Sequence, residues 1–156
     1  MSNPLDELYR DIIMDHYRYP RGHKKLDRAD MSGEGNNPLC GDEIEVRLKL
    51  DGDTVQDLSV GCRGCAISVA SGSMLYEIVR GKSLDEVRQV AAVVKALIKG
   101  EAQPPNINID MGDLEALQGV RKFPVRVKCA LLAWTTLTES IESFERQEVR
   151  HITTTE

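Results

Sequence analysis

Residues 43–60 read EIEVRLKLDGDTVQDLSV, and this stretch decides the fold class. Apolar residues occupy every second position from Ile44 to Leu50, and charged residues occupy the positions between them. A period of two with one charged face predicts a half-buried antiparallel strand. The Asp51-Gly52-Asp53 sequence predicts a tight turn, so residues 55–60 return as a second strand.

Helical patterns lie on both sides of this hairpin. Pro4 opens a first helix that ends before Pro20, with His16 on its apolar face, whereas residues 21–37 are polar and irregular. Ser83 and Glu86 form a capping box for a later helix. The other expected helices cover residues 66–80, 113–118 and 124–146. The sequence therefore predicts an α+β domain, in which a small antiparallel sheet of about three strands packs against several α-helices.

The length of 156 residues fits one domain, which we place at residues 1–146, followed by a polar tail at 147–156. Residues 101–122 begin with a Pro104-Pro105 loop and continue with a weak apolar alternation at Ile107 and Ile109. We find no internal repeats.

Composition narrows the classes of partner. The net charge of -5 and the pI near 5.3 argue against a nucleic-acid partner. No apolar run reaches the roughly 18 residues that a membrane span needs. Residues 1–6 lack a basic region followed by an apolar stretch, so we expect no secretion signal and a cytoplasmic location.

Four cysteines in such a chain are expected to be metal ligands or reactive thiols rather than disulfides. Cys40 and Asp42 belong to the sequence Asn-Pro-Leu-Cys-Gly-Asp at 37–42, and a thiolate and a carboxylate two residues apart can reach one tetrahedral cation. Cys65 directly precedes a predicted helix, and Cys129 lies near the start of the last one. Because all three cysteines mark ends of elements, we expect them to converge on one face of the domain.

Other interpretations of the cysteines remain open at this point. Cys62 and Cys65 form a C-x2-C pair, which would be half of a Cys₄ structural zinc site with Cys40 and Cys129, or a redox pair. The redox interpretation is weaker, because such pairs occur in βαβ units and a hairpin precedes this one. Each cysteine can also be a buried small apolar residue. The three histidines have no ligand spacing to the cysteines.

Four segments together resemble the U-type iron–sulfur cluster assembly family, which includes NifU N-terminal and IscU-like proteins, and in particular its SufU branch. The segments are YRDIIMDHY at 9–17, NPLCGD at 37–42, GCAISVASGSM at 64–74 and FPVRVKCALLAW at 123–134. Lys128 stands where the scaffold branch has a histidine, and residues 101–122 look like the insertion typical of SufU. Cys62 departs from the family pattern, which usually has glycine there.

The resemblance implies a SufE/NifU-like fold and a zinc ion held by Cys40, Asp42, Cys65 and Cys129. It also implies that Cys40 accepts sulfur from a pyridoxal-phosphate cysteine desulfurase of the SufS type, for delivery to a downstream iron–sulfur scaffold. Arg126 and Lys128 are candidates for charged residues beside the metal, and Cys62 is expected to be a bystander.

Three functions compete at this stage. The first is zinc-dependent sulfur transfer through Cys40, which would make the protein a sulfurtransferase that acts with a cysteine desulfurase. The alternative is a scaffold on which Cys40, Cys65 and Cys129 assemble an iron–sulfur cluster for transfer to apoproteins. The third is a structural zinc module without chemistry of its own.

Overall fold

The computed structural model describes residues 4–104 and 109–154, with side chains described as far as residue 147. It has the expected α+β architecture. Its strands are β1 (Met31–Asn37), β2 (Asp42–Asp51) and β3 (Thr54–Arg63). Its helices are α1 (Pro4–Arg18), α2 (Ala66–Val79), α3 (Leu84–Lys99), the 3₁₀ helix η1 (Gly112–Lys122) and α4 (Pro124–Thr154).

The predicted hairpin is the centre of the molecule. The sheet has the order β1-β2-β3 with both pairs antiparallel, so β2 is its middle strand. Ile44, Val46 and Leu48 are buried, as the alternation predicted. Leu50 is only partly buried, and the register of β2 against β3 shifts between Lys49 and Leu50.

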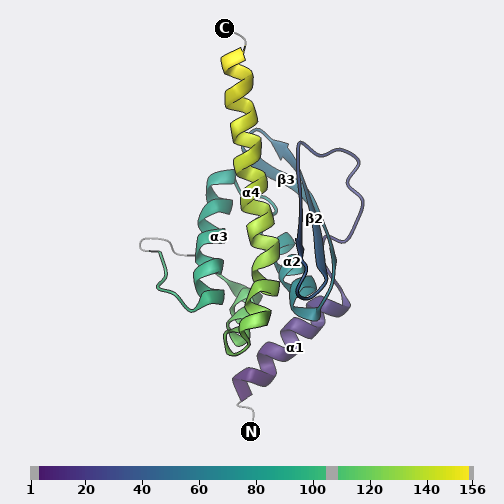
Figure 1. Cartoon of the computed structure of the whole chain (residues 1–156), viewed down its shortest axis with the longest axis vertical. Helices are drawn as coiled ribbons and strands as arrows, with labels where there is room; N and C mark the ends of the chain where they lie inside the picture. Colours follow the sequence, from purple (N-terminus) through teal and green to yellow (C-terminus); the bar gives the residue numbers. More distant parts are fainter. Residues whose placement is uncertain (1–3, 105–108, 155–156) are drawn as a thin grey trace.

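Helices cover one face of the sheet, and the hydrophobic core lies between the two layers. In Figure 1, α4 runs along the molecule beside the sheet, with α3 on its other side and α1 at the end where the chain begins. Trp134 of α4 is fully buried in this core. Helix α3 has the capping box of Ser83 and Glu86, and it ends at Gly100 in a left-handed conformation, as expected. None of the helices in the described part of the chain is both long and apolar enough to cross a membrane.

The sheet has the expected three strands, but the location of the third strand corrects the sequence analysis. Residues 31–37 were expected to be irregular, yet they form β1 and pair with β2 from Met31 opposite Leu48 to Asn37 opposite Asp42. The sequence MSGEGNN carries no alternation, because Gly33 and Gly35 present no side chain. Ile107 of the weak alternation and Pro105 of the loop lie outside the described part of the chain.

The C-terminal segment also differs from expectation. Residues 147–154, which the sequence indicated to be a tail, continue α4 as one helix to Thr154. Once a helix is nucleated and packed, each further residue adds a hydrogen bond at little cost. These last turns project beyond the rest of the molecule in Figure 1. The short helix expected at 113–118 is the longer 3₁₀ helix η1.

Candidate metal centre

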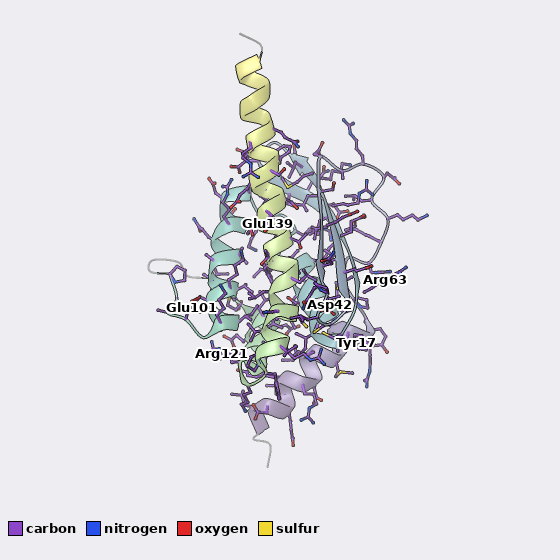
Figure 2. All side chains as sticks on the ribbon, in the orientation of Figure 1. Tyr17, Asp42, Arg63, Glu101, Arg121 and Glu139 are labelled. Carbon is purple, nitrogen blue, oxygen red and sulfur yellow. The ribbon has the colours of Figure 1, made fainter. Side chains whose placement is uncertain are left out.

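The predicted ligands come from three places in the chain and meet at one end of the molecule. Cys40 and Asp42 lie in and just after the β1–β2 turn, Cys65 is the N-cap residue of α2, and Cys129 lies in the second turn of α4. The turn closes with a hydrogen bond from the Cys40 N–H to the Asn37 carbonyl (3.2 Å). Figure 2 shows Asp42 at the end of the sheet near α1. The ligand atoms of Cys40, Asp42 and Cys129 lie within 4.8 Å of one another.

Asp42 is a fully buried carboxylate with one satisfied oxygen and one bare oxygen. Its Oδ1 accepts a hydrogen bond from the Cys65 N–H (2.9 Å), whereas its Oδ2 has no hydrogen-bond partner. The approach requires Gly64, because a side chain there would collide with Asp42, and Gly64 has a positive φ of 148°. A buried, unpartnered carboxylate oxygen beside two thiols is the environment that a divalent cation completes.

Cys129 is the most enclosed of the thiols. Its side chain is fully buried, and the Asn37 side-chain amide donates to its sulfur (3.7 Å). Burial raises the pKa of the Cys129 thiol far above its ordinary value, and hydrogen bonds with Asp42, Cys40 and Cys65 add to this. A thiol in this position becomes a thiolate only if a positive charge is supplied, and a metal ion supplies it.

Cys65 lies at the margin of the cluster. It is partly exposed, and its Sγ is 3.9 Å from the Ser68 hydroxyl. It is not one of the three residues whose ligand atoms fall within 4.8 Å of each other, although its side chain forms hydrogen bonds with Cys129 and Asp42. The structure thus brings three of the four predicted ligands close together, and the fourth, Cys65, lies at the margin of this group.

Cys40 is the reachable member of the cluster. It is partly exposed and opens into a hollow of about 610 Å³ between the β1–β2 turn and the start of α4. Three apolar side chains stand exposed around this hollow, namely Leu39, Phe123 and Val125. A reactant carried by another protein can therefore approach Cys40, whereas Cys129 is closed to it.

The two charged residues expected beside the metal, Arg126 and Lys128, differ in how close they lie to the cysteine cluster. A hydrogen bond with Cys129, and then the charges of the Cys65, Cys129 and Cys40 sulfurs, raise the pKa of the Arg126 guanidinium. Arg126 also lines the hollow into which Cys40 opens. Lys128 is exposed, and no hydrogen bond or ion pair joins it to the described part of the chain. The structure thus brings Arg126 to the site but not Lys128.

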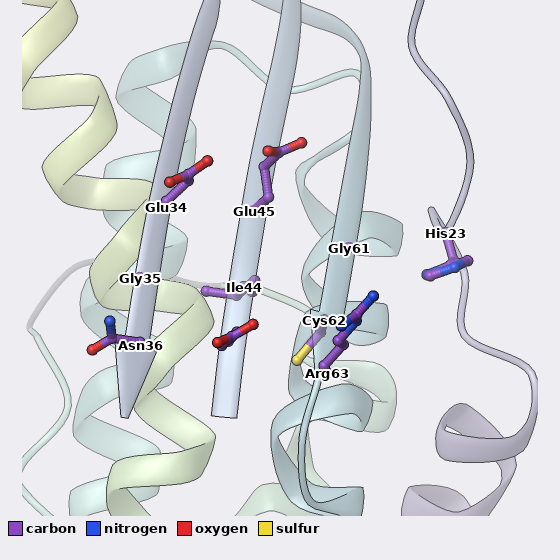
Figure 3. Close-up of a pocket in the computed structure, with 10 residues that line it drawn as sticks. His23, Glu34, Gly35, Asn36, Ile44, Glu45, Gly61, Cys62 and Arg63 are labelled. Atoms are coloured by element: carbon purple, nitrogen blue, oxygen red, sulfur yellow. The ribbon is translucent and has the colours of Figure 1, made fainter. Parts of the chain in front are cut away.

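Cys62 stands outside the close group. It pairs with Ile44 across the sheet, and burial raises the pKa of its thiol to about 11. Figure 3 shows Cys62 beside Arg63 among the residues that line a separate hollow of about 730 Å³, which also include Glu34 and Glu45. The Cys62 sulfur does not belong to the group that Cys40, Asp42 and Cys129 form.

Sequence analysis missed two residues that support the cluster. Asn37 donates to Cys129, and Ser68 is a buried serine whose hydroxyl lies next to Cys65 and forms a hydrogen bond with Asp42. A signal for Ser68 was present, because residues three apart lie on the same side of a helix. Asn37 had no such signal, because 92 residues separate it from Cys129.

Comparison with known proteins agrees with the geometry. The model of the NifU-like N terminal domain family matches residues 8–130. The chain is 42% identical to the zinc-dependent sulfurtransferase SufU of Bacillus subtilis, over 90% of this chain and 94% of that protein. It is 38% identical to the iron–sulfur cluster assembly scaffold protein IscU of Streptococcus pyogenes, over 88% and 85% of the two chains.

The fold has a solved counterpart. The crystal structure of an iron–sulfur cluster assembly scaffold protein for the SUF system from Fervidobacterium islandicum matches with a TM-score of 0.76 and 32% identity, over 83% of this chain and 93% of that chain. The resemblance seen in the sequence is confirmed by the family match, by these relatives and by the shared fold. The chain belongs to the NifU-like N-terminal domain family of iron–sulfur cluster assembly proteins.

Proposed function

We propose that this protein is a zinc-dependent sulfur-transfer protein, in which Cys40 accepts sulfur from the persulfide of a pyridoxal-phosphate cysteine desulfurase. The observation that carries the proposal is the contrast within the cluster: Cys40 is open to a partner, while Asp42 and Cys129 are buried beside it. The Bacillus subtilis relative, which is named a zinc-dependent sulfurtransferase, supports it.

Cys40, Asp42, Cys65 and Cys129 are the residues that would hold the zinc. Bound zinc stabilises thiolates and, having no redox chemistry, does not oxidise them. Three thiolates and one carboxylate leave the site with a net charge of about -2 around a divalent ion, by summing the ionised ligands. Arg126, which already reaches these sulfurs, offsets part of that charge.

The transfer step needs only the thiolate of Cys40 and the persulfide of the partner. The Cys40 sulfur attacks the outer sulfur of the persulfide, and a new S–S bond forms on Cys40. The S–S bond on the desulfurase breaks, and its electron pair leaves on the desulfurase cysteine as a thiolate. No external oxidant or reductant is required, because one thiolate replaces another. We expect the Cys40 persulfide to supply a downstream iron–sulfur scaffold.

The alternative is a scaffold that assembles a cluster on Cys40, Cys65 and Cys129, as the name of the Streptococcus pyogenes relative indicates for that protein. Lys128 argues against it, because a protonated amine has no lone pair to give to iron. Reconstitution with iron and sulfide separates the two functions. A stable cluster that forms in preference to zinc and passes intact to an acceptor protein would favour the scaffold.

The test of sulfur transfer is alanine release by a cysteine desulfurase with and without the zinc-loaded protein. We expect the wild type to accelerate release, and mass spectrometry to find one added sulfur atom on Cys40. The Cys40→Ala variant should lose both effects and remain folded. The matched variant Cys62→Ala should keep both effects and about one zinc per chain by metal analysis, because Cys62 lies outside the close group. Full stimulation by Cys40→Ala would contradict the proposal.

A further inference from the structure

His16 is a fully buried histidine that joins three elements far from the cysteine cluster. It lies in the last turn of α1, and its ring is 0% exposed. Its Nδ1 is 2.7 Å from the Ser73 hydroxyl on α2, and its Nε2 is 2.8 Å from Asp113 Oδ2 on η1. Glu77, one turn beyond Ser73, lies roughly 18 Å along α2 from Cys65 at 1.5 Å per residue. The two groups are therefore separate sites.

The second acid makes this arrangement more than a histidine–aspartate pair. Glu77 Oε1 lies 3.5 Å from the same nitrogen, His16 Nε2. The three ligand atoms, from His16, Glu77 and Asp113, all lie within 4.8 Å of one another. Nε2 carries at most one proton, so the ring can donate a hydrogen bond to only one of the two carboxylates at a time.

The other side of the ring is arranged as metal-binding histidines require. The Ser73 hydroxyl accepts the Arg21 N–H (2.9 Å) and retains a second lone pair. That lone pair can accept a hydrogen bond from Nδ1–H, which leaves the lone pair of Nε2 free toward the two carboxylates. An oxygen that accepts from the far nitrogen is the usual partner of a metal-bound histidine, because it fixes the tautomer and the ring orientation.

The site is open to an ion from solution. The side chains of Glu77 and Asp113 are 50% and 53% exposed, and they border a hollow of about 240 Å³ with Asp110. Ligands 2.0–2.2 Å from a tetrahedral ion lie roughly 3.4 Å apart, so small rotations of the two carboxylates suffice. Arg21 lies 3.8 Å from Glu77 but forms a closer bond to Asp15 (2.7 Å), which remains when Glu77 turns to an ion.

We propose that His16, Glu77 and Asp113 form a second metal site, which takes a divalent first-row transition ion through one imidazole nitrogen and two carboxylates. Water fills the remaining positions. This donor set contains no thiolate, so it suits ions that prefer nitrogen and oxygen, in contrast to the cysteine cluster. Binding there joins α1, α2 and η1, and the site does not depend on the proposed sulfur transfer.

Manganese is the probe that separates the two sites, because Mn²⁺ favours oxygen and nitrogen over thiolate. Zinc-loaded protein is titrated with Mn²⁺, and free Mn²⁺ is followed by electron paramagnetic resonance. We expect one saturable Mn²⁺ site per chain and a melting temperature that rises with Mn²⁺. A further equivalent of Zn²⁺ should displace the manganese, since zinc binds such sites more tightly.

The variants Glu77→Gln and Asp113→Asn should each weaken Mn²⁺ binding at least tenfold. Asp113→Asn retains an oxygen that accepts from His16, so the fold is kept. The matched control is Glu115→Gln, an exposed acid of the same helix η1, which should bind Mn²⁺ as the wild type does. The absence of a saturable site in the zinc-loaded protein, or equal affinity in Asp113→Asn and the wild type, would show that His16 and Asp113 form only a structural hydrogen bond.

Discussion

Asp42 is the residue on which metal binding at the cysteine cluster depends most directly. Burial raises the pKa of its carboxyl, but the hydrogen bond from the Cys65 N–H and the nearby side chains of Cys129, Ser68 and Cys65 outweigh burial, so the pKa lies below its usual value. Asp42 is therefore an anion at neutral pH. Its Oδ2 remains without a partner in the protein, and a buried charge of this kind is stable only when a cation or donor meets it.

The substitution Asp42→Asn tests this role. The amide oxygen can still accept the Cys65 N–H, so the turn is preserved, but the anionic ligand is lost. We expect the affinity for zinc, measured by competition with a chromophoric chelator, to fall by about tenfold or more, which is the scale on which even indirect supports of a metal site act. Glu45→Gln, an exposed carboxylate change on the same strand, should leave the affinity unchanged. Equal affinities in both variants would remove Asp42 from the ligand set.

At the scale of elements, the packing of α4 on β1 holds the cluster together. Asn37 ends β1 and Cys129 lies near the start of α4, so the contact between these two elements sets the distance between turn and helix. Two glycines of β1 make the contact close: a side chain at Gly33 would collide with Ser140, and one at Gly35 would collide with Thr136. The absent side chains leave room for the helix.

Gly35→Ala should therefore destabilise the protein by about 1–3 kcal/mol, the usual cost of overpacking, in denaturant unfolding. Thr136→Ala removes the hydroxyl that the new methyl group meets, so Gly35→Ala should cost less in that background than in the wild type. Gly61→Ala is the matched control, because open space surrounds a methyl group at that position of the same sheet. If the cost of Gly35→Ala were the same in both backgrounds, Thr136 would not be the obstacle.

At the scale of the whole molecule, one ion pair links the segment after α1 to the sheet. Lys24 Nζ lies 2.8 Å from Asp57 Oδ2 on β3. Burial raises the pKa of Asp57, but hydrogen bonds from Lys24 and from the Leu58 N–H outweigh it, so the pKa is lowered. The hydrogen bond to Asp57, with a second one to Tyr76, raises the pKa of Lys24.

These shifts give the pair a defined pH window. A carboxyl with a lowered pKa stabilises the fold above its unfolded pKa of about 3.9 and loses this as the pH falls through its folded pKa. A lysine with a raised pKa stabilises below about 10.4 and loses this as the pH rises through its folded pKa. The pair thus contributes between about pH 4 and pH 10.

Asp57→Asn should lower the free energy of unfolding by less than about 1 kcal/mol at pH 7, since the pair is partly exposed, and this effect should shrink as the pH falls through the lowered pKa of Asp57. Urea titrations at several pH values measure this difference against the wild type. Asp53→Asn, in the exposed β2–β3 turn, should have the same free energy of unfolding as the wild type at each of these pH values. A loss for Asp57→Asn that stays constant with pH would mean that the effect is not electrostatic.

The sequence by itself determined the features that depend on neighbouring residues. The alternation from Ile44 to Leu50, the Asp-Gly-Asp turn and the capping box at Ser83 all act within a few residues, and the structure has each of them. The four motif segments led to the right family, and the positions of the cysteines at element ends predicted that Cys40 and Cys129 lie close together. Each of these signals depends on residues that lie close together in the sequence.

Only the tertiary structure decided the features that depend on distant contacts. Gly33 and Gly35 carry no side chain to show a strand, and β1 exists because β2 pairs with it and α4 fills the space above it. The sequence places His16 on the apolar face of its helix, but only packing against α2 and η1 encloses it fully, and its acidic partner Asp113 is 97 residues away. Distances between residues so far apart in the chain follow from how the helices pack on the sheet, and no local pattern encodes them.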